Sequence, residues 1–139
     1  MKKKEYFLRD YPSQIEERLR YRDTDSQGHI NNAVYVTLFE VGRTNILYDP
    51  RYQLRDENTS FMVAHIGIDY LAEVKWPNTV TIGTRLTNIG RTSFAFEHVV
   101  FDGDICAAVA KTVIVKANKL TRQTEPLSDK NKQVLEQLR

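Results

Sequence analysis

The stretch from Tyr21 to Tyr35 concentrates polar side chains directly before an apolar run. It reads YRDTDSQGHINNAVY, so two aspartates are followed by a Gly-His pair and two asparagines. If a helix begins here, its first turn offers unpaired N–H groups and a partial positive charge, which together can stabilise an oxyanion. A carboxylate beside that turn could activate water as a general base or attack as a nucleophile. The stretch is therefore either a well-capped helix start or a helix start that performs catalysis.

A long helix is predicted directly after this polar stretch. Asparagine is a good N-cap, so Asn31 or Asn32 is expected to begin a helix over residues 31–46. Apolar and small residues then recur at steps of three and four: Val34, Tyr35, Leu38, Phe39, Val41, Gly42 and Ile46. The apolar face is wide, which predicts a largely buried helix. Pro50 ends it, and residues 48–60 are predicted to form a loop.

The rest of the chain is strand-like. Residues 15–22 alternate, with Leu19 and Tyr21 on the same face as Ile15, which predicts a first strand. Asp102-Gly103 is a strong tight-turn signal between two apolar runs. Further strands are predicted over residues 60–74, 79–89, 92–101 and 105–118, in hairpin-like succession. A short terminal helix capped by Ser128 follows.

This order of elements predicts one α+β domain over residues 1–139. Five strands form a sheet with one apolar face, and only one long apolar helix is available to cover it. The economical arrangement wraps an antiparallel sheet around that helix. The sheet also has edges, and exposed edges are often paired between two copies of a chain. We therefore expect at least a homodimer.

The amino-acid composition limits which binding partners and which cellular compartment are expected for this chain. A net charge of +2 is too small to indicate binding to nucleic acid. No apolar run approaches the length of a membrane-spanning helix, about 18 residues. The single cysteine, Cys106, excludes an internal disulfide and a Cys-rich zinc site. It is expected to be a buried structural thiol, and a reducing, cytoplasmic setting follows as the default. His29, His65 and the carboxylates lack metal-ligand spacing, so neither a metal nor a cofactor is expected.

The motif D-T-D-x-x-G-H-x-N-N-x-x-Y, followed by a buried helix and four strands, resembles the hot-dog-fold acyl-CoA thioesterases. Within them it is similar to the 4-hydroxybenzoyl-CoA thioesterase group and its fatty-acyl-CoA relatives. The segments EVKWPNTVTIGTRL and GRTSFAFEHVVF extend the resemblance over nearly the whole chain. It implies a hot-dog fold, with a five-stranded antiparallel sheet wrapped around one central helix. It also implies a homodimer or a tetramer of two dimers, with the active site at a subunit interface.

The resemblance implies roles for residues of the polar stretch. Asp25 would be the catalytic carboxylate, and a backbone N–H near Asn32 would hold the thioester carbonyl. Gly28 lets the backbone approach closely. His29 either orients Asp25 or the acyl carbonyl, or is a packed loop histidine. Asp23 is expected to be structural. In the 4-hydroxybenzoyl enzyme the residues after the glycine are apolar and aromatic, whereas here they are HINN, which favours an aliphatic acyl-CoA.

The candidate substrate-binding residues are Tyr35, Glu40, His65, Arg91 and Ser93. Tyr35 is expected to line the pocket from the core, and Arg91, with Lys111 and Lys116, could meet the phosphates of CoA. Two other functions stay open. A hot-dog dehydratase would use His29 with Glu40, and Glu40 is also the backup base of a thioesterase. A non-catalytic acyl-CoA-binding domain would bind the same ligand without turnover.

Overall fold

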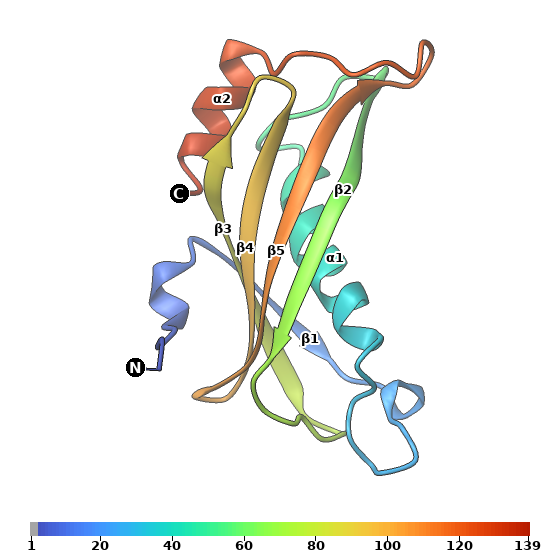
Figure 1. The fold of residues 1–139 in the computed structure, drawn as a ribbon, viewed down its shortest axis with the longest axis vertical. Coiled ribbons are helices and arrows are strands. Elements are labelled where there is room, and N and C mark those ends of the chain that lie inside the picture. Colours follow the sequence, from blue (N-terminus) through green and yellow to red (C-terminus); the bar gives the residue numbers. More distant parts are fainter. Residues whose placement is uncertain (1–2) are drawn as a thin grey trace.

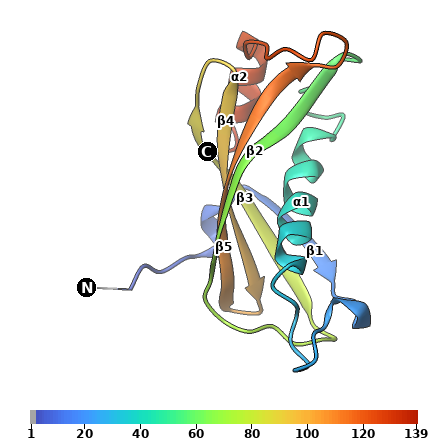
Figure 2. The same ribbon diagram turned by 45° about the vertical axis from the view of Figure 1, so that its right-hand side comes forward.

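One long helix packs on one face of a five-stranded antiparallel sheet in the computed structural model, which describes residues 3–139 (Figures 1 and 2). The strands are β1 Ser13–Arg18, β2 Thr59–Tyr70, β3 Thr79–Ile89, β4 Ser93–Asp102 and β5 Ile105–Asn118. The helices are α1 Val34–Leu47 and α2 Asp129–Glu136, with short 3-10 turns η1 Leu8–Asp10 and η2 Tyr21–Asp23. The predicted hot-dog fold is confirmed.

The strand order is β1-β3-β4-β5-β2, so the prediction of a simple hairpin succession is wrong for β2 and β3. Strands β3, β4 and β5 do form a meander, with Gly103 in the left-handed region (φ +59°) at the predicted tight turn. Because these three strands carry most of the buried positions, they occupy the centre. The more exposed β1 and β2 flank them at the two edges.

Two strands end earlier than their sequence patterns suggest. The first strand ends at Arg18, because η2 turns the chain, and Tyr21 is consequently 74% exposed with its ring edge against Trp76. Strand β2 ends at Tyr70, because the N–H groups of the next two residues both turn to the Ala107 carbonyl. Residues 71–78 therefore form a connection rather than the end of a strand.

The helix begins at Val34, three residues later than predicted, and its N-cap position is Ala33. The cause is local: the Asn31 side chain accepts a hydrogen bond from the Ala33 N–H (2.9 Å), and residues 31–33 form a turn before the helix. The apolar side of α1 is buried against the sheet as expected, with Phe39 and Ile46 fully inaccessible. Its other side, including Val36 and Glu40, is exposed in the single chain.

The centre of the core holds a histidine that the sequence did not single out. His98 on β4 is fully buried, and its two ring nitrogens lie 2.9 Å from the hydroxyls of Thr84 on β3 and Thr112 on β5. Burial, together with the nearby positive charge of Arg43, lowers the pKa of His98 to about 3. Gly42 lets α1 approach at this level, because a Cβ there would lie 2.7 Å from a methyl carbon of Ile82.

The N-terminal segment covers part of the sheet face opposite α1 (Figure 2). Tyr11 is buried there, and its hydroxyl donates a hydrogen bond to Glu97 (2.6 Å). Cys106 borders this cluster and is half-buried rather than fully buried, since it lies next to the β4–β5 turn. Burial still raises the pKa of the Cys106 thiol. Within residues 3–139, none of the helices is long and apolar enough to cross a membrane.

Candidate active site

The polar stretch forms a closed loop because Asp23 ties its two ends together. Asp23 is only 6% exposed, and its carboxylate accepts hydrogen bonds from the backbone N–H (2.8 Å) and the guanidinium (3.1 Å) of Arg20. Its carbonyl accepts a hydrogen bond from the Asn31 N–H (2.9 Å). Burial would raise the pKa of Asp23, but the hydrogen bonds and charge of Arg20 outweigh it and lower that pKa. Asp23 thus has the contacts of a structural residue.

Asp25 is held at the loop by one of its two carboxylate oxygens. Oδ1 accepts hydrogen bonds from the N–H groups of Gln27 (2.8 Å) and His29 (3.2 Å), and the Asp25 N–H donates to the His29 carbonyl (2.8 Å). Gly28 has φ +80°, a conformation that the tight loop requires and that glycine adopts without strain. In the part of the chain that the structure describes, no donor contacts Oδ2. The carboxylate is therefore oriented by the loop and keeps one oxygen available.

The start of α1 presents an unpaired donor next to this loop. The N–H groups of Ala33, Val34 and Tyr35 are satisfied by Asn31 and Asn32. Among residues 3–139, nothing accepts a hydrogen bond from the Asn32 N–H. A free N–H at a helix N-terminus carries part of the positive end of the helix dipole and can bind a carbonyl oxygen that becomes negative.

Asp25 and Asn32 line the same pocket, of about 390 Å³. Three segments build it: the polar loop, the first turn of α1 and the connection that follows β2, which meets the loop through the hydrogen bond from the Ile30 N–H to the Val74 carbonyl (2.8 Å). In Figure 1 they lie together at the lower end of the molecule. The lining residues are Asp25, Gln27, His29, Ile30, Asn32, Tyr35, Tyr70, Leu71, Ala72 and Glu73. The structure therefore brings together the predicted Asp25, His29, Asn32 and Tyr35.

Two residues of this pocket, Tyr70 and Glu73, were missed by sequence reasoning. Glu73 contacts His29, with Oε2 3.1 Å from the ring Nε2, so the histidine side chain is directed to Glu73. The Tyr70 hydroxyl donates to the Asn32 carbonyl (2.9 Å), and its ring packs edge-to-face on Tyr35 (centroids 5.2 Å apart). Tyr70 belongs to no motif, and Glu73 opens the segment EVKWPNTVTIGTRL without being marked there as a site residue. Only the point at which β2 ends brings them to the pocket.

The other predicted substrate-binding residues do not line this pocket. Glu40 lies on the exposed side of α1 and faces Arg43 at 3.8 Å. His65 is exposed on the edge strand β2. Arg91 lies in the β3–β4 turn and Ser93 is the first residue of β4, at the opposite end of the sheet (Figure 1). Sequence spacing does not determine the end of the sheet at which a turn lies, and this explains their placement.

Lysines expected to meet CoA phosphates are also away from the pocket. Lys111 is exposed in the middle of β5, and Lys116 donates a hydrogen bond to Asn131 (2.9 Å) near the far end of that strand. Across residues 3–139, no three or more His, Cys, Asp and Glu side chains are grouped to hold a metal ion.

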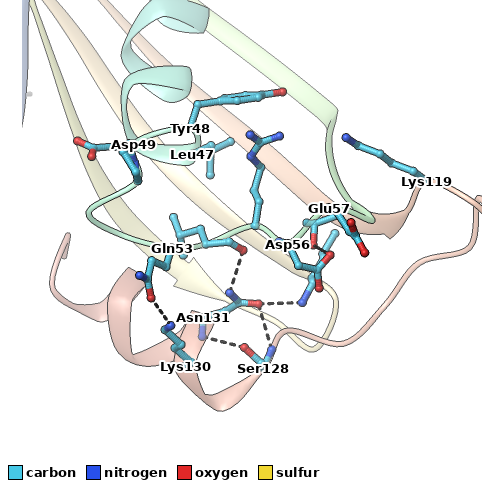
Figure 3. A pocket seen from close by; sticks show the side chains of 15 residues that line it. Leu47, Tyr48, Asp49, Gln53, Asp56, Glu57, Lys119, Ser128, Lys130 and Asn131 are labelled. Atoms are coloured by element: carbon cyan, nitrogen blue, oxygen red, sulfur yellow. Dashed lines mark hydrogen bonds between the residues drawn. The ribbon is translucent and has the colours of Figure 1, made fainter.

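A larger cavity of about 820 Å³ lies at the other end of α1, between the loop after the helix and the start of α2 (Figure 3). Its polar side chains largely satisfy one another. Lys130 donates to Gln53 (2.7 Å), and the buried Asn131 accepts from Lys116 and donates to the Leu54 carbonyl (3.1 Å). Size alone would favour this cavity, but the free carboxylate oxygen and the unpaired helix N–H are both in the smaller pocket.

Comparison with known proteins identifies the family of this chain. The model of the thioesterase-like superfamily matches residues 19–138, which include the polar loop. The acyl-CoA thioester hydrolase YbgC of Escherichia coli O6:H1 is 27% identical over 116 residues, covering 81% of this chain and 82% of the relative. A Thermus thermophilus thioesterase, solved with coenzyme A and Zn, is 27% identical with a TM-score of 0.81, over 93% of this chain and 95% of that chain. A Pseudomonas aeruginosa PAO1 protein has a TM-score of 0.87 at 22% identity, over 95% and 94% of the two chains, and shares the fold.

Proposed function

Because this chain belongs to the thioesterase-like superfamily and is a thioester hydrolase, we propose that it hydrolyses an aliphatic acyl-CoA to the free acid and CoA. The observation that carries the proposal is the pairing, in one pocket, of the open Asp25 carboxylate oxygen with the unpaired Asn32 N–H. YbgC, an acyl-CoA thioester hydrolase by name, and the coenzyme A bound in the Thermus enzyme support the choice of acyl-CoA.

In the proposed reaction the thioester carbonyl oxygen accepts a hydrogen bond from the Asn32 N–H. That donor and the positive end of the α1 dipole stabilise the negative charge that forms on this oxygen as the carbonyl carbon is attacked. Asp25 acts through Oδ2, either by taking a proton from the attacking water or by attacking directly to form an anhydride that water then hydrolyses. In both routes the C–S bond breaks, CoA leaves as the thiolate, and the acyl group leaves as the carboxylic acid.

The choice of an aliphatic acyl group comes from the residues HINN after Gly28, where the 4-hydroxybenzoyl enzyme has apolar and aromatic residues. In the pocket, Ile30, Leu71, Ala72 and the buried Tyr35 supply the apolar lining beside the polar side chains. The dehydratase alternative would require Glu40 beside His29, and Glu40 instead lies on the exposed side of α1. A cytoplasmic setting remains a prediction from the single, half-buried Cys106.

A panel of acyl-CoA thioesters tests the proposed substrate. Purified protein is mixed with saturated acyl-CoAs from acetyl to palmitoyl and with 4-hydroxybenzoyl-CoA, and released CoA is measured with a thiol reagent. We expect at least one aliphatic thioester to be hydrolysed faster than the aromatic one. A preference for 4-hydroxybenzoyl-CoA would contradict the aliphatic assignment. Binding of acyl-CoA without any release of CoA would contradict hydrolysis and favour a binding domain.

We also propose that the chain forms a homodimer, with a tetramer of two dimers as the further assembly. The edge strand β2 has unpaired backbone groups along a row that includes Met62, 50% exposed, and Val63, 42% exposed. An exposed apolar edge favours pairing with a second copy. If the β2 strands of two copies pair in antiparallel fashion, opposite ends of the two sheets come together. Arg91 and Ser93 of one copy would then approach the Asp25 pocket of the other copy.

Light scattering at micromolar concentration tests the assembly. We expect a mass of at least about twice the 16.2 kDa of one chain. Val63→Lys places a charge on the β2 edge and should lower the mass, because edge lysines oppose strand pairing. Leu120→Lys is the matched control, since Leu120 is 77% exposed on a loop outside the sheet, and it should leave the mass unchanged. A wild-type mass of one chain would contradict the proposal.

A further inference from the structure

We propose that Tyr70 is a positioning residue that holds the Asn32 backbone in place for the thioester carbonyl. The inference rests on the proposed function, because it assigns a role to Tyr70 in that reaction. Neither the motif nor the apolar periodicity of the chain points to Tyr70. Its assignment comes from two contacts, one of its hydroxyl and one of its ring, at the point where β2 meets the start of α1.

The hydroxyl contact is directed at the residue that carries the unpaired donor. Tyr70 donates to the Asn32 carbonyl at 2.9 Å, and the same carbonyl accepts the Tyr35 N–H at 3.3 Å. Within the chain as described from residue 3 to 139, no other side chain from outside residues 31–35 hydrogen-bonds to this turn. Tyr70 is thus the side-chain tether between the sheet and the beginning of α1.

The beginning of α1 is otherwise held by backbone hydrogen bonds of Ile30 and Asn31 and by the Asn31 side chain. The N-cap residue is Ala33, which has no side chain to cap the helix, and residues 31–33 are exposed. Tyr70, in contrast, is part of the sheet. It is the last residue of β2 and pairs with Ala108 of β5, which is buried. A hydrogen bond from this rigid element adds a restraint at Asn32 itself, beyond the backbone hydrogen bonds of Ile30 and Asn31.

Position matters here because an oxyanion donor is effective only when it lies about 2.7–3.1 Å from the developing negative charge. Small misplacements of such a donor lower the rate more than they weaken substrate binding, because the interaction is strongest in the transition state. The hydrogen bond from the Tyr70 hydroxyl to the Asn32 carbonyl joins two uncharged groups. The loss of such a hydrogen bond typically changes an equilibrium constant or a rate constant about 3- to 10-fold.

Tyr70→Phe removes the hydroxyl and keeps the ring that packs on Tyr35. We expect kcat for an accepted acyl-CoA to fall about 3- to 10-fold, while KM changes less than about twofold, as for the loss of a transition-state interaction. Tyr48→Phe is the matched control. Tyr48 is also an exposed tyrosine, but it lies beside the larger cavity at the other end of α1 and should leave both constants unchanged.

A second measurement is independent of activity. Amide hydrogen exchange of residues 32–35, followed by NMR in Tyr70→Phe and wild type, should be faster in the variant, because the tether to the turn is lost. Unchanged kcat and unchanged amide exchange in Tyr70→Phe would overturn the role of Tyr70. A change in KM with kcat unchanged would overturn it as well. If wild-type protein hydrolyses no acyl-CoA, the proposed function fails, whereas active wild type with an equally active Tyr70→Phe overturns only this inference.

Discussion

Asp25→Asn is expected to lose most turnover of acyl-CoA, by a factor on the order of 10²–10⁴, which is the range that a general base typically contributes. The amide cannot take a proton from water or attack the carbonyl carbon, so both proposed routes are removed. Its Oδ1 can still accept from the N–H groups of Gln27 and His29, which should keep the loop closed. Steady-state release of CoA gives the rate, and calorimetric titration with acyl-CoA should show that binding is retained.

Asp23→Asn is the matched control for this variant. It changes the same functional group two residues away, but Asp23 is buried and paired with Arg20 rather than open to the pocket. It should therefore cost less activity and more stability than Asp25→Asn, measured as kcat and as the midpoint of thermal unfolding. Hydrolysis of every accepted acyl-CoA by Asp25→Asn at the wild-type rate would refute a catalytic Asp25.

A second large effect is expected in the dependence of stability on pH. The pKa of His98 is lowered to about 3 in the folded chain, against about 6.5 when the chain is unfolded. Between these values the unfolded chain binds a proton at this histidine that the folded chain does not. Lowering the pH through this window should therefore reduce the free energy of unfolding, by up to about 1.4 kcal/mol per pH unit from His98.

His98→Gln separates this contribution from the others. Glutamine can hydrogen-bond to Thr84 and Thr112 but does not titrate. The free energy of unfolding of the variant should therefore fall less steeply than that of the wild type between about pH 6 and 4. Asp23 contributes mainly below this window, because its lowered pKa gives stability that is lost only as it becomes protonated. Equal slopes for His98→Gln and wild type, in chemical denaturation over this pH range, would contradict the role of His98.

The sequence predicted the elements of the fold better than their connections. The helix period around Phe39 and the Asp102-Gly103 turn are local signals, and both correspond to observed structure. The pairing of β2 with β5 depends on which strands are buried on both faces. That burial is determined by the packing of the whole sheet and not by the local sequence of any one strand. The helix start was placed three residues early because the Asn31 side chain closes a turn of its own before α1.

The grouping of candidate site residues in one pocket was predicted only where one short stretch of chain supplies them. Asp25, His29 and Asn32 are seven residues apart at most and share a loop, so their convergence needs no knowledge of the sheet. Tyr70 and Glu73 reach the pocket only because β2 ends beside the helix start. Arg91, Ser93, His65 and Glu40 were chosen by residue type, and the fold places them outside this pocket of the single chain.

A crystal structure of Asp25→Asn with a bound acyl-CoA tests the central claim most directly, because the slowed variant should retain its substrate. We expect a thioester carbonyl oxygen about 2.7–3.1 Å from the Asn32 N–H, with residue 25 facing the carbonyl carbon. Wild-type crystals soaked with CoA alone serve as the control for where the nucleotide end binds. A thioester held in the larger cavity beside Asn131, with the Asn32 N–H unoccupied, would contradict a catalytic site at Asp25 and Asn32.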